Sequence, residues 1–270
     1  MVAPARIVTM TTDFGTDDPI DGEMKGAILT VDPSLGIVDL TPAVPPHDIV
    51  AGACLLDFGS RAFPPGSVHV AVVDPGVGTG RRAVAVESED AIWVGPDHGV
   101  LARALRGRRI VKSHALEAPP GPSEIVATTF DGRERFAPFA ARIASGEDLA
   151  RFGPAIADLT VPPPAPVPVP GGPPVAVDVV HVDRFGNVYL DLTRAAIGPD
   201  ARVEVDPGAG GAVDRVLRAY GDAGDDRPFL IWNAAGLLEL AVREGRAADV
   251  LALRRGDAVA VRVLRATAAP

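Results

Sequence analysis

Val72-Val73-Asp74-Pro75-Gly76-Val77-Gly78-Thr79-Gly80-Arg81-Arg82 is the stretch from which the fold can be read. The apolar run leading into it, residues 68–73, predicts a buried strand that delivers Asp74 to its end. Glycine and proline then turn the chain sharply, and residues 83–86 predict a second strand directly after Arg81. Because ligands of open α/β sheets bind at strand tips, Asp74 and Arg81 are the first candidate site residues.

Two other interpretations of this stretch stay open. The Asp74–Arg81 pair can be purely structural, holding a tight turn. The glycines can instead cradle a phosphate group, although neither the G-x-x-x-x-G-K-[ST] pattern nor the G-x-G-x-x-G pattern is present.

The composition excludes several classes of protein. Hydrophobic residues make up 47% of the 270 residues and charged residues 23%, which is typical of globular proteins. A net charge of -9, without a basic stripe, argues against binding to nucleic acid. No apolar run has membrane-spanning length and the N-terminus lacks a signal-peptide core, so we expect no membrane association. The only cysteine, Cys54, cannot form an internal disulfide, and we therefore expect a cytoplasmic protein.

The N-terminal part of the chain alternates between strand-like and helix-like segments. Strands are predicted at 7–11, 37–40, 68–73, 83–86, 91–94 and 110–112, and helices at 24–31, 49–58, 100–105 and 135–143. We expect Asp48 to cap the helix that starts at residue 49. This alternation predicts an α/β domain over residues 1–161, with a mainly parallel sheet covered by helices.

Residues 162–174 are mostly proline, which predicts a stiff linker between two domains. Short apolar runs then follow at 175–182, 188–192, 203–205, 229–232 and 258–263. They predict a smaller antiparallel, β-barrel-like domain over residues 175–270.

Four further segments place polar or aromatic side chains beside a glycine, where a strand or a loop ends. They are Thr12-Asp13-Phe14-Gly15, Gly95-Pro96-Asp97-His98-Gly99, Thr129-Phe130-Asp131-Gly132 and Asp183-Arg184-Phe185-Gly186-Asn187. Each also has an ordinary interpretation as a turn, a capped helix start or a hairpin. Gly132 permits a close approach of backbone and ligand. The acidic residues between 17 and 23 lack the spacing of a calcium loop.

Taken in order, these motifs resemble one family, the S-adenosylmethionine (SAM) hydroxide adenosyltransferases, or SAM hydrolases, which are related to fluorinase and chlorinase. Matching segments run from Thr11-Thr12-Asp13-Phe14-Gly15 through Val73-Asp74-Pro75-Gly76-Val77-Gly78-Thr79 to Gly236-Leu237-Leu238-Glu239, across nearly the whole chain. The resemblance implies hydrolysis of SAM at the ribose C5′ to adenosine and L-methionine. It also implies a homotrimer with active sites between subunits, SAM as the substrate, and neither cofactor nor metal.

The resemblance implies a role for each matching residue. Asp74 and Arg81, with a third catalytic member at position 131, would activate and orient the attacking water. The substrate would be held by Asp13 at the ribose hydroxyls, Asp183 at the amino group, Asn187 at the adenine, and Phe130 and Phe185 packed on the nucleoside, with Gly132 beside it.

Two departures from the family pattern concern catalysis. Asp131 stands where the family has histidine, and His98 stands where it has asparagine. Our hypothesis is that His98 and Asp131 approach each other and restore an imidazole–carboxylate pair. The alternative is that His98 is a surface loop residue and that Asp131 weakens or abolishes hydrolysis.

Other departures leave the substrate open. Ile20, Ala234 and Leu237 replace residues that carry hydroxyl groups in the family, so a different sulfonium or nucleoside substrate remains an alternative. Two other functions stay open: halide-dependent adenosyl transfer, and binding of SAM or adenosine with an impaired catalytic set.

Overall fold

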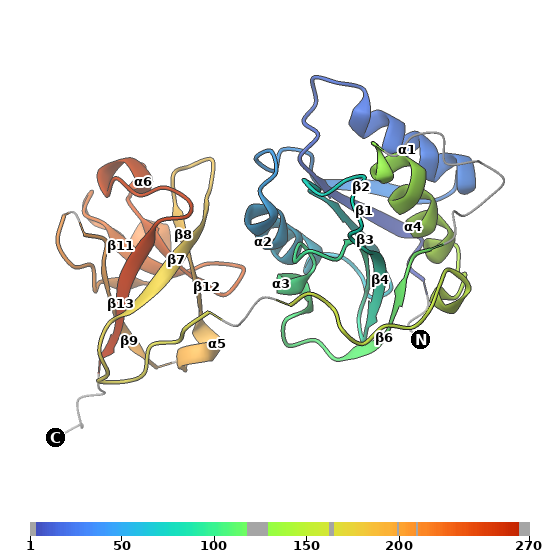
Figure 1. Cartoon of the computed structure of the whole chain (residues 1–270). Helices are drawn as coiled ribbons and strands as arrows, with labels where there is room; N and C mark the ends of the chain where they lie inside the picture. The colour runs from blue at the N-terminus through green and yellow to red at the C-terminus, as the bar shows by residue number, and fades with distance from the viewer. Residues whose placement is uncertain (1–3, 118–128, 162–164, 199, 209, 265–270) are drawn as a thin grey trace. The chain divides into compact units, whose positions relative to one another are not determined.

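The computed structural model describes residues 4–117, 129–161, 165–198, 200–208 and 210–264. The chain forms two compact units, Met1–Pro162 and Pro163–Pro270, and each unit has its own hydrophobic core (Figure 1). The first unit combines helices with a sheet, whereas the second is built mainly of strands. The predicted α/β fold class with a smaller β-rich second domain is confirmed.

The first unit is built on a six-stranded sheet in the order β2-β1-β3-β5-β4-β6. These strands are β1 (Ile7–Thr12), β2 (Gly36–Thr41), β3 (Val68–Val72), β4 (Ala83–Ser88), β5 (Ile92–Pro96) and β6 (Ile110–Ala115). The first four strands of this order are parallel, while β4 is antiparallel to both of its neighbours. The reversal of β4 follows from its short connection to β5, because a tight turn can join only antiparallel strands.

Helices cover both faces of this sheet. α1 (Ile20–Val31) and α4 (Ala137–Ala144) pack on one face, and α2 (Ile49–Ser60) and α3 (Ala102–Leu105) pack on the other (Figure 1). Successive residues of a strand point to opposite faces, so Val70 joins the first core and Ala71 the second. Both are fully buried, as expected of a sheet covered on two sides.

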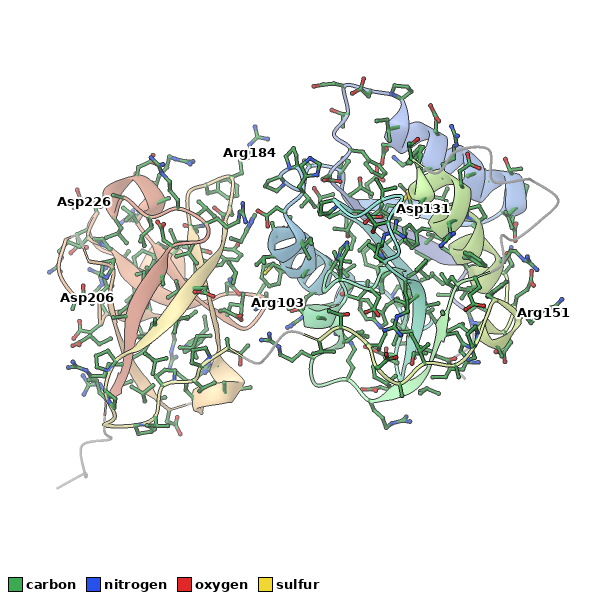
Figure 2. All side chains as sticks on the ribbon, viewed as in Figure 1. Arg103, Asp131, Arg151, Arg184, Asp206 and Asp226 are labelled. Carbon is green, nitrogen blue, oxygen red and sulfur yellow. The ribbon has the colours of Figure 1, made fainter. Side chains whose placement is uncertain are left out.

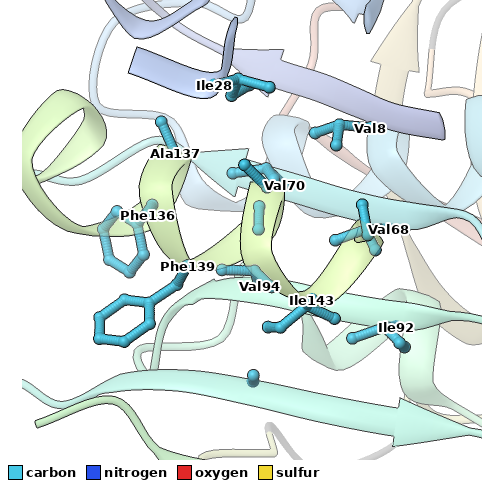
Figure 3. Packing of buried hydrophobic residues seen from close by; sticks show 14 of the residues in the cluster. Val8, Ile28, Val68, Val70, Ile92, Val94, Phe136, Ala137, Phe139 and Ile143 are labelled. Atoms are coloured by element: carbon cyan, nitrogen blue, oxygen red, sulfur yellow. The ribbon is translucent and has the colours of Figure 1, made fainter. Parts of the chain in front are cut away.

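The last residue of the turn before α4 and α4 itself supply large side chains to the first core. Phe136, Phe139 and Ile143 belong to this core together with strand residues such as Val68, Val70 and Val94 (Figure 3). A π-helical turn, η1 (Gly132–Phe136), leads into α4, and a 3-10 turn, η2 (Leu149–Arg151), follows it. The helix predicted over 135–143 is therefore present, and Asp131 lies directly before the π-helical turn that leads into it.

Two helix starts illustrate how local sequence positions the elements. The carboxylate of Asp48 accepts a hydrogen bond from the backbone N–H of Ala51 at 2.9 Å, which confirms the predicted cap of α2. α1 begins at Ile20, four residues before the predicted start, because Asp21 and Glu23 favour the positive end of the helix dipole. Over the described ranges, none of the helices is long and apolar enough to cross a membrane.

The second unit contains a seven-stranded, nearly closed, barrel-like sheet in the order β10-β11-β12-β8-β7-β13-β9. These strands are β7 (Val175–Val182), β8 (Val188–Thr193), β9 (Arg202–Asp206), β10 (Val216–Leu217), β11 (Phe229–Trp232), β12 (Leu237–Ala241) and β13 (Ala258–Leu264). The unit also holds the short helices α5 (Arg194–Ile197), α6 (Ala247–Val250) and the 3-10 turn η3 (Tyr220–Asp222). All strand pairs are antiparallel except β10 with β11.

The core of this second unit follows the alternation of its strands. In β13, Val259, Val261 and Val263 are buried, while the residues between them are more exposed. β12 was not predicted, because its residues are buried throughout and show no period of two. Within the proline-rich segment, Pro170 bridges to Val263 of β13, so its described part is attached to the second unit.

Candidate active site

The reversed strand β4 explains how an acid and a distant arginine meet. β3 ends just before Asp74, at the edge where the parallel strands have their carboxyl ends. Because β4 is antiparallel to β5, its first residue lies at that same edge. The connecting turn is fixed by Thr79, whose hydroxyl donates to the carbonyl of Gly76 at 2.7 Å. Arg81, directly before β4, is thereby brought back to Asp74.

The Asp74–Arg81 pair is buried and bidentate. Nε of Arg81 donates to Oδ1 of Asp74 at 2.9 Å, and Nη2 donates to Oδ2. The two side chains are only 5% and 10% exposed. Burial by itself would raise the pKa of Asp74, but His98 and Arg81 outweigh it, and the pKa lies below its ordinary value. Asp74 is therefore a carboxylate near neutral pH.

Arg81 also holds Asp131, the residue that replaces the family histidine. Nη2 of Arg81 donates to Oδ2 of Asp131 at 2.5 Å, and Asp131 is 7% exposed. On its other side, Oδ1 of Asp131 lies 4.0 Å from Nε of Arg135. Asp131 directly precedes η1, in the first unit (Figure 2). One guanidinium thus bridges two carboxylates.

His98 lies beside Asp74. Its Nε2 is 3.6 Å from Oδ1 of Asp74, which is an ion-pair distance but longer than a hydrogen bond. Among the described residues, no hydrogen bond or ion pair joins His98 to Asp131, so the predicted pairing of these two is wrong. Asp131 is instead paired with two arginines, Arg81 at Oδ2 and Arg135 at Oδ1.

Several predicted residues line one cavity of about 240 Å³ in the first unit. Asp74 and Asp131 share it with Asp13, Phe130 and Gly132. Asp13 is oriented by the backbone, since its Oδ2 accepts from the N–H of His47 at 2.8 Å. The cavity therefore combines three carboxylates with an aromatic wall, which suits a cationic ligand that carries an aromatic ring system.

The aromatic wall depends on the glycine next to it. The rings of Phe14 and Phe130 meet edge to face, with centroids 5.5 Å apart. A Cβ on Gly132 would lie 2.7 Å from the ring of Phe130, so any larger residue would displace that ring. Phe14 was not predicted as a site residue, although its place directly after Asp13 at a strand tip is a usable signal.

A second cavity, of about 860 Å³, lies in the second unit. The hairpin between β7 and β8 supplies Asp183, Phe185 and Asn187 to its lining, the three residues for which the family resemblance implies substrate binding. Phe185 is 73% exposed, so its ring offers an apolar face. The hairpin turns at Gly186, whose φ is +86°. A larger residue there would place its Cβ 2.6 Å from the Cβ of Arg246.

Asp183 builds this hairpin as well as lining the cavity. Its Oδ1 accepts from the backbone N–H groups of Phe185 and Asn187, each at 2.9 Å. Its Oδ2 accepts from Nδ2 of Asn187 at 2.9 Å and from the hydroxyl of Tyr189 at 3.3 Å. The carboxylate is thus largely satisfied within the protein, and it fixes the orientation of the Asn187 amide.

Two residues of this region, Tyr220 and Glu239, were not predicted as site residues, although Glu239 ends the matching segment Gly236-Leu237-Leu238-Glu239. Tyr220 lines the cavity, and its hydroxyl donates to Oε1 of Glu239 at 2.7 Å. Glu239 is fully buried, and burial raises the pKa of its carboxyl. Tyr220 lies in a loop without any motif, so no sequence signal identified it.

Comparison with known proteins identifies the family of the chain. Family models described as the SAM hydroxide adenosyltransferase N-terminal and C-terminal domains match residues 8–153 and 177–260. A protein from Salinispora tropica named (R)-S-adenosyl-L-methionine hydrolase is 37% identical over 269 residues, covering 96% of this chain and 99% of that protein. A fluorinase from Actinoplanes sp. is 26% identical over 301 residues, covering 94% and 97%. The crystal structure of an uncharacterized conserved protein from Thermotoga maritima matches with a TM-score of 0.86 and 31% identity, covering 95% and 99%. This chain belongs to the SAM hydroxide adenosyltransferase family.

Proposed function

We propose that this protein hydrolyses SAM to adenosine and L-methionine by attack of water at the ribose C5′. The observation that carries the proposal is that Asp74 and Asp131, which line one cavity, are bridged by Arg81. Its relatives named (R)-S-adenosyl-L-methionine hydrolase, matched over nearly the full chain, support the same reaction.

The leaving group determines what the protein must supply. As the bond from water oxygen to C5′ forms, the C5′–S bond breaks, and its electron pair stays on sulfur. Methionine therefore departs as a neutral thioether and needs no general acid. The remaining requirement is to hold water in line with the C5′–S bond and to accept its proton. We propose that neither a metal nor a cofactor takes part.

Two carboxylates meet this requirement. An ionised carboxylate only accepts hydrogen bonds, so a water molecule between Asp74 and Asp131 would direct both hydrogens toward them. A lone pair of the water oxygen would then face away from both acids, toward C5′. Arg81 orients both carboxylates, and their negative charge favours transfer of a proton from the attacking water to one of them. Aspartate at position 131 is thus compatible with hydrolysis in this geometry.

The same charges disfavour a halide nucleophile. A halide at this place would lie beside two carboxylates whose shared arginine is already paired with both. Like charges at short range repel, and burial strengthens the repulsion. We therefore place hydrolysis ahead of chloride-dependent adenosyl transfer.

Product analysis distinguishes the possible functions. Purified protein is incubated with SAM in water enriched in ¹⁸O, with and without chloride, and the products are separated by chromatography and weighed by mass spectrometry. We expect ¹⁸O-labelled adenosine and methionine in both cases. A 5′-chlorinated nucleoside would show halide transfer instead, and unchanged SAM that still binds would show an impaired catalytic set.

We further propose that Asp13 binds the ribose hydroxyls and that the hairpin residues Asp183, Phe185 and Asn187 bind the amino group and the adenine. Vicinal hydroxyls suit a carboxylate, and one amide can both donate to and accept from adenine. The Phe130 ring, kept in place by Gly132, would pack on the nucleoside.

We also propose a homotrimer with active sites between subunits, as the family resemblance implies, and a cytoplasmic location, because the only cysteine, Cys54, cannot form an internal disulfide. Light scattering on the purified protein tests the trimer. Mixing inactive variants of Asp74 and Asn187 tests the shared sites, because mixed trimers would regain activity only if each site takes residues from two subunits. Cell fractionation tests the location.

A further inference from the structure

The imidazole of His98 is unusual in being buried without a hydrogen bond. Its side chain is 17% exposed, and both ring nitrogens are buried and lack a hydrogen-bond partner among the described residues. Buried polar atoms in native proteins are nearly always paired, so two unpaired nitrogens on one ring need an explanation. Structural packing alone would favour an apolar residue at this position.

Asp74 is the group that this ring faces. Nε2 of His98 lies 3.6 Å from Oδ1 of Asp74, and a shift of about 0.7 Å would bring this contact to an ordinary hydrogen-bond distance. The neighbouring acid Asp97 is engaged elsewhere, since it accepts from Arg82 at 2.5 Å and from the N–H of Thr160 at 2.8 Å. Within the described part of the chain, Asp74 is the one charged group at ion-pair distance from His98.

The hydrogen bonds from Arg81 to Asp74 are not independent of Asp131. Nη2 of Arg81 donates to both carboxylates, so a movement of Asp131 would also disturb the contact with Asp74. A second donor on Asp74 would make its orientation independent of Asp131. His98 follows β5, a fully buried strand, and is therefore well fixed for this purpose.

We propose that His98 is a positioning residue for Asp74, donating a hydrogen bond from Nε2 to Oδ1 when SAM and water fill the cavity. The imidazole does not line the cavity, so it acts through the carboxylate and touches neither substrate nor water. This inference rests on the proposed hydrolysis of SAM, and it gives Asp74 two holders, Arg81 and His98.

The experiment compares His98→Leu with His98→Gln. Leucine fills space without donating, whereas the glutamine amide can donate from nearly the place of Nε2. We expect His98→Leu to lower kcat about 10- to 100-fold, the range supported by a hydrogen bond to a charged group. The KM for SAM should change less than about 2-fold, because His98 does not contact substrate. His98→Gln should retain most of the wild-type kcat.

A matched control is His114→Gln, at a second buried histidine of the same unit, whose Nδ1 contacts the carbonyl of Gly153 at 2.9 Å. This variant should keep the wild-type kcat. If His98→Leu keeps wild-type kcat, or if the glutamine and leucine variants are equally impaired, the inference is overturned. If the leucine variant does not fold, His98→Asn replaces it, because asparagine is too short to reach Asp74 and should lower kcat while glutamine does not. Absence of adenosine from the wild-type protein would instead refute the proposed function.

Discussion

Replacing Asp74 by asparagine tests the centre of the proposed site. The change preserves size but removes the charge and turns one acceptor oxygen into an NH₂ donor. Arg81, which donates to both oxygens of Asp74, then keeps a single good contact there. The attacking water also loses one of its two proposed acceptors.

The structure sets the expected size of the effect. Breaking a buried ion pair completely costs about 3–5 kcal/mol, because a charge is left alone. Here Arg81 retains Asp131 at 2.5 Å, so the loss corresponds to one hydrogen bond to a charged group, about 1.5–3 kcal/mol of unfolding free energy. Loss of proton acceptance should lower kcat more strongly, by about 10²- to 10⁴-fold.

The pH dependence of this loss has a definite sign. The pKa of Asp74 in the folded protein lies below its ordinary value, so the unfolded state binds a proton first as the pH falls. The stabilisation by Asp74 is present at neutral pH and is lost as the pH falls through the folded pKa. The difference in unfolding free energy between the wild type and Asp74→Asn should therefore shrink as the pH falls below the ordinary pKa of aspartate, about 3.9.

Urea unfolding of the two proteins and chromatographic detection of adenosine are the assays. Asp148→Asn is the control, since Asp148 is 45% exposed, pairs with Lys112 at 2.8 Å, and its amide replacement can still accept from the N–H of Ala150. It should change the unfolding free energy by less than about 1 kcal/mol and leave kcat intact. Wild-type kcat in Asp74→Asn, or a stability loss independent of pH, would refute the reasoning.

Four other predictions concern the two cavities, a buried histidine and the proposed absence of a metal. Gly132→Ala should raise the KM for SAM about tenfold, measured by initial rates, because the new Cβ would displace the Phe130 ring. Asn187→Ala should weaken adenosine binding about tenfold in calorimetry, and unchanged affinity would remove Asn187 from the proposed adenine site. Burial, with a smaller effect of Arg108, lowers the pKa of His69 to about 4. The unfolded chain therefore binds a proton at this histidine below about pH 6.5, whereas the folded protein does so only near pH 4. Stability should therefore fall by up to about 3 kcal/mol between pH 6.5 and pH 4, and His69→Gln should lack this slope in urea unfolding. EDTA should leave adenosine release unchanged, and loss of activity that added metal restores would contradict a metal-free reaction.

Much of the fold could be predicted because its signals are local. Continuous apolar runs marked the buried strands of the first sheet, and short apolar runs separated by turns marked β7, β8 and β13 in the second unit. The strand tips also placed Asp13 and Asp74 correctly in one cavity, since parallel strands end at the same edge of a sheet.

What could not be predicted depends on contacts between distant residues. No local pattern could decide which carboxylate His98 would approach, because Asp74 and Asp131 are 57 residues apart in the chain and only the folded chain brings both to Arg81. Tyr220 was missed for the same reason, since only the folded chain brings its loop to the hairpin that carries Asn187. Local pattern identifies which segments carry chemistry, but pairing within a site is a tertiary property.

The division of the chain into two units, each with its own core, separates two kinds of mutation. Under the proposed function, substitutions at Asp74, Arg81 or Asp131 in the first unit would alter the nucleophile, whereas substitutions in the hairpin 183–187 of the second unit would alter how the adenine and the amino group are bound. Libraries at the two places would then act on different properties and could be recombined. A change of nucleophile at constant substrate would need substitutions in the first unit alone.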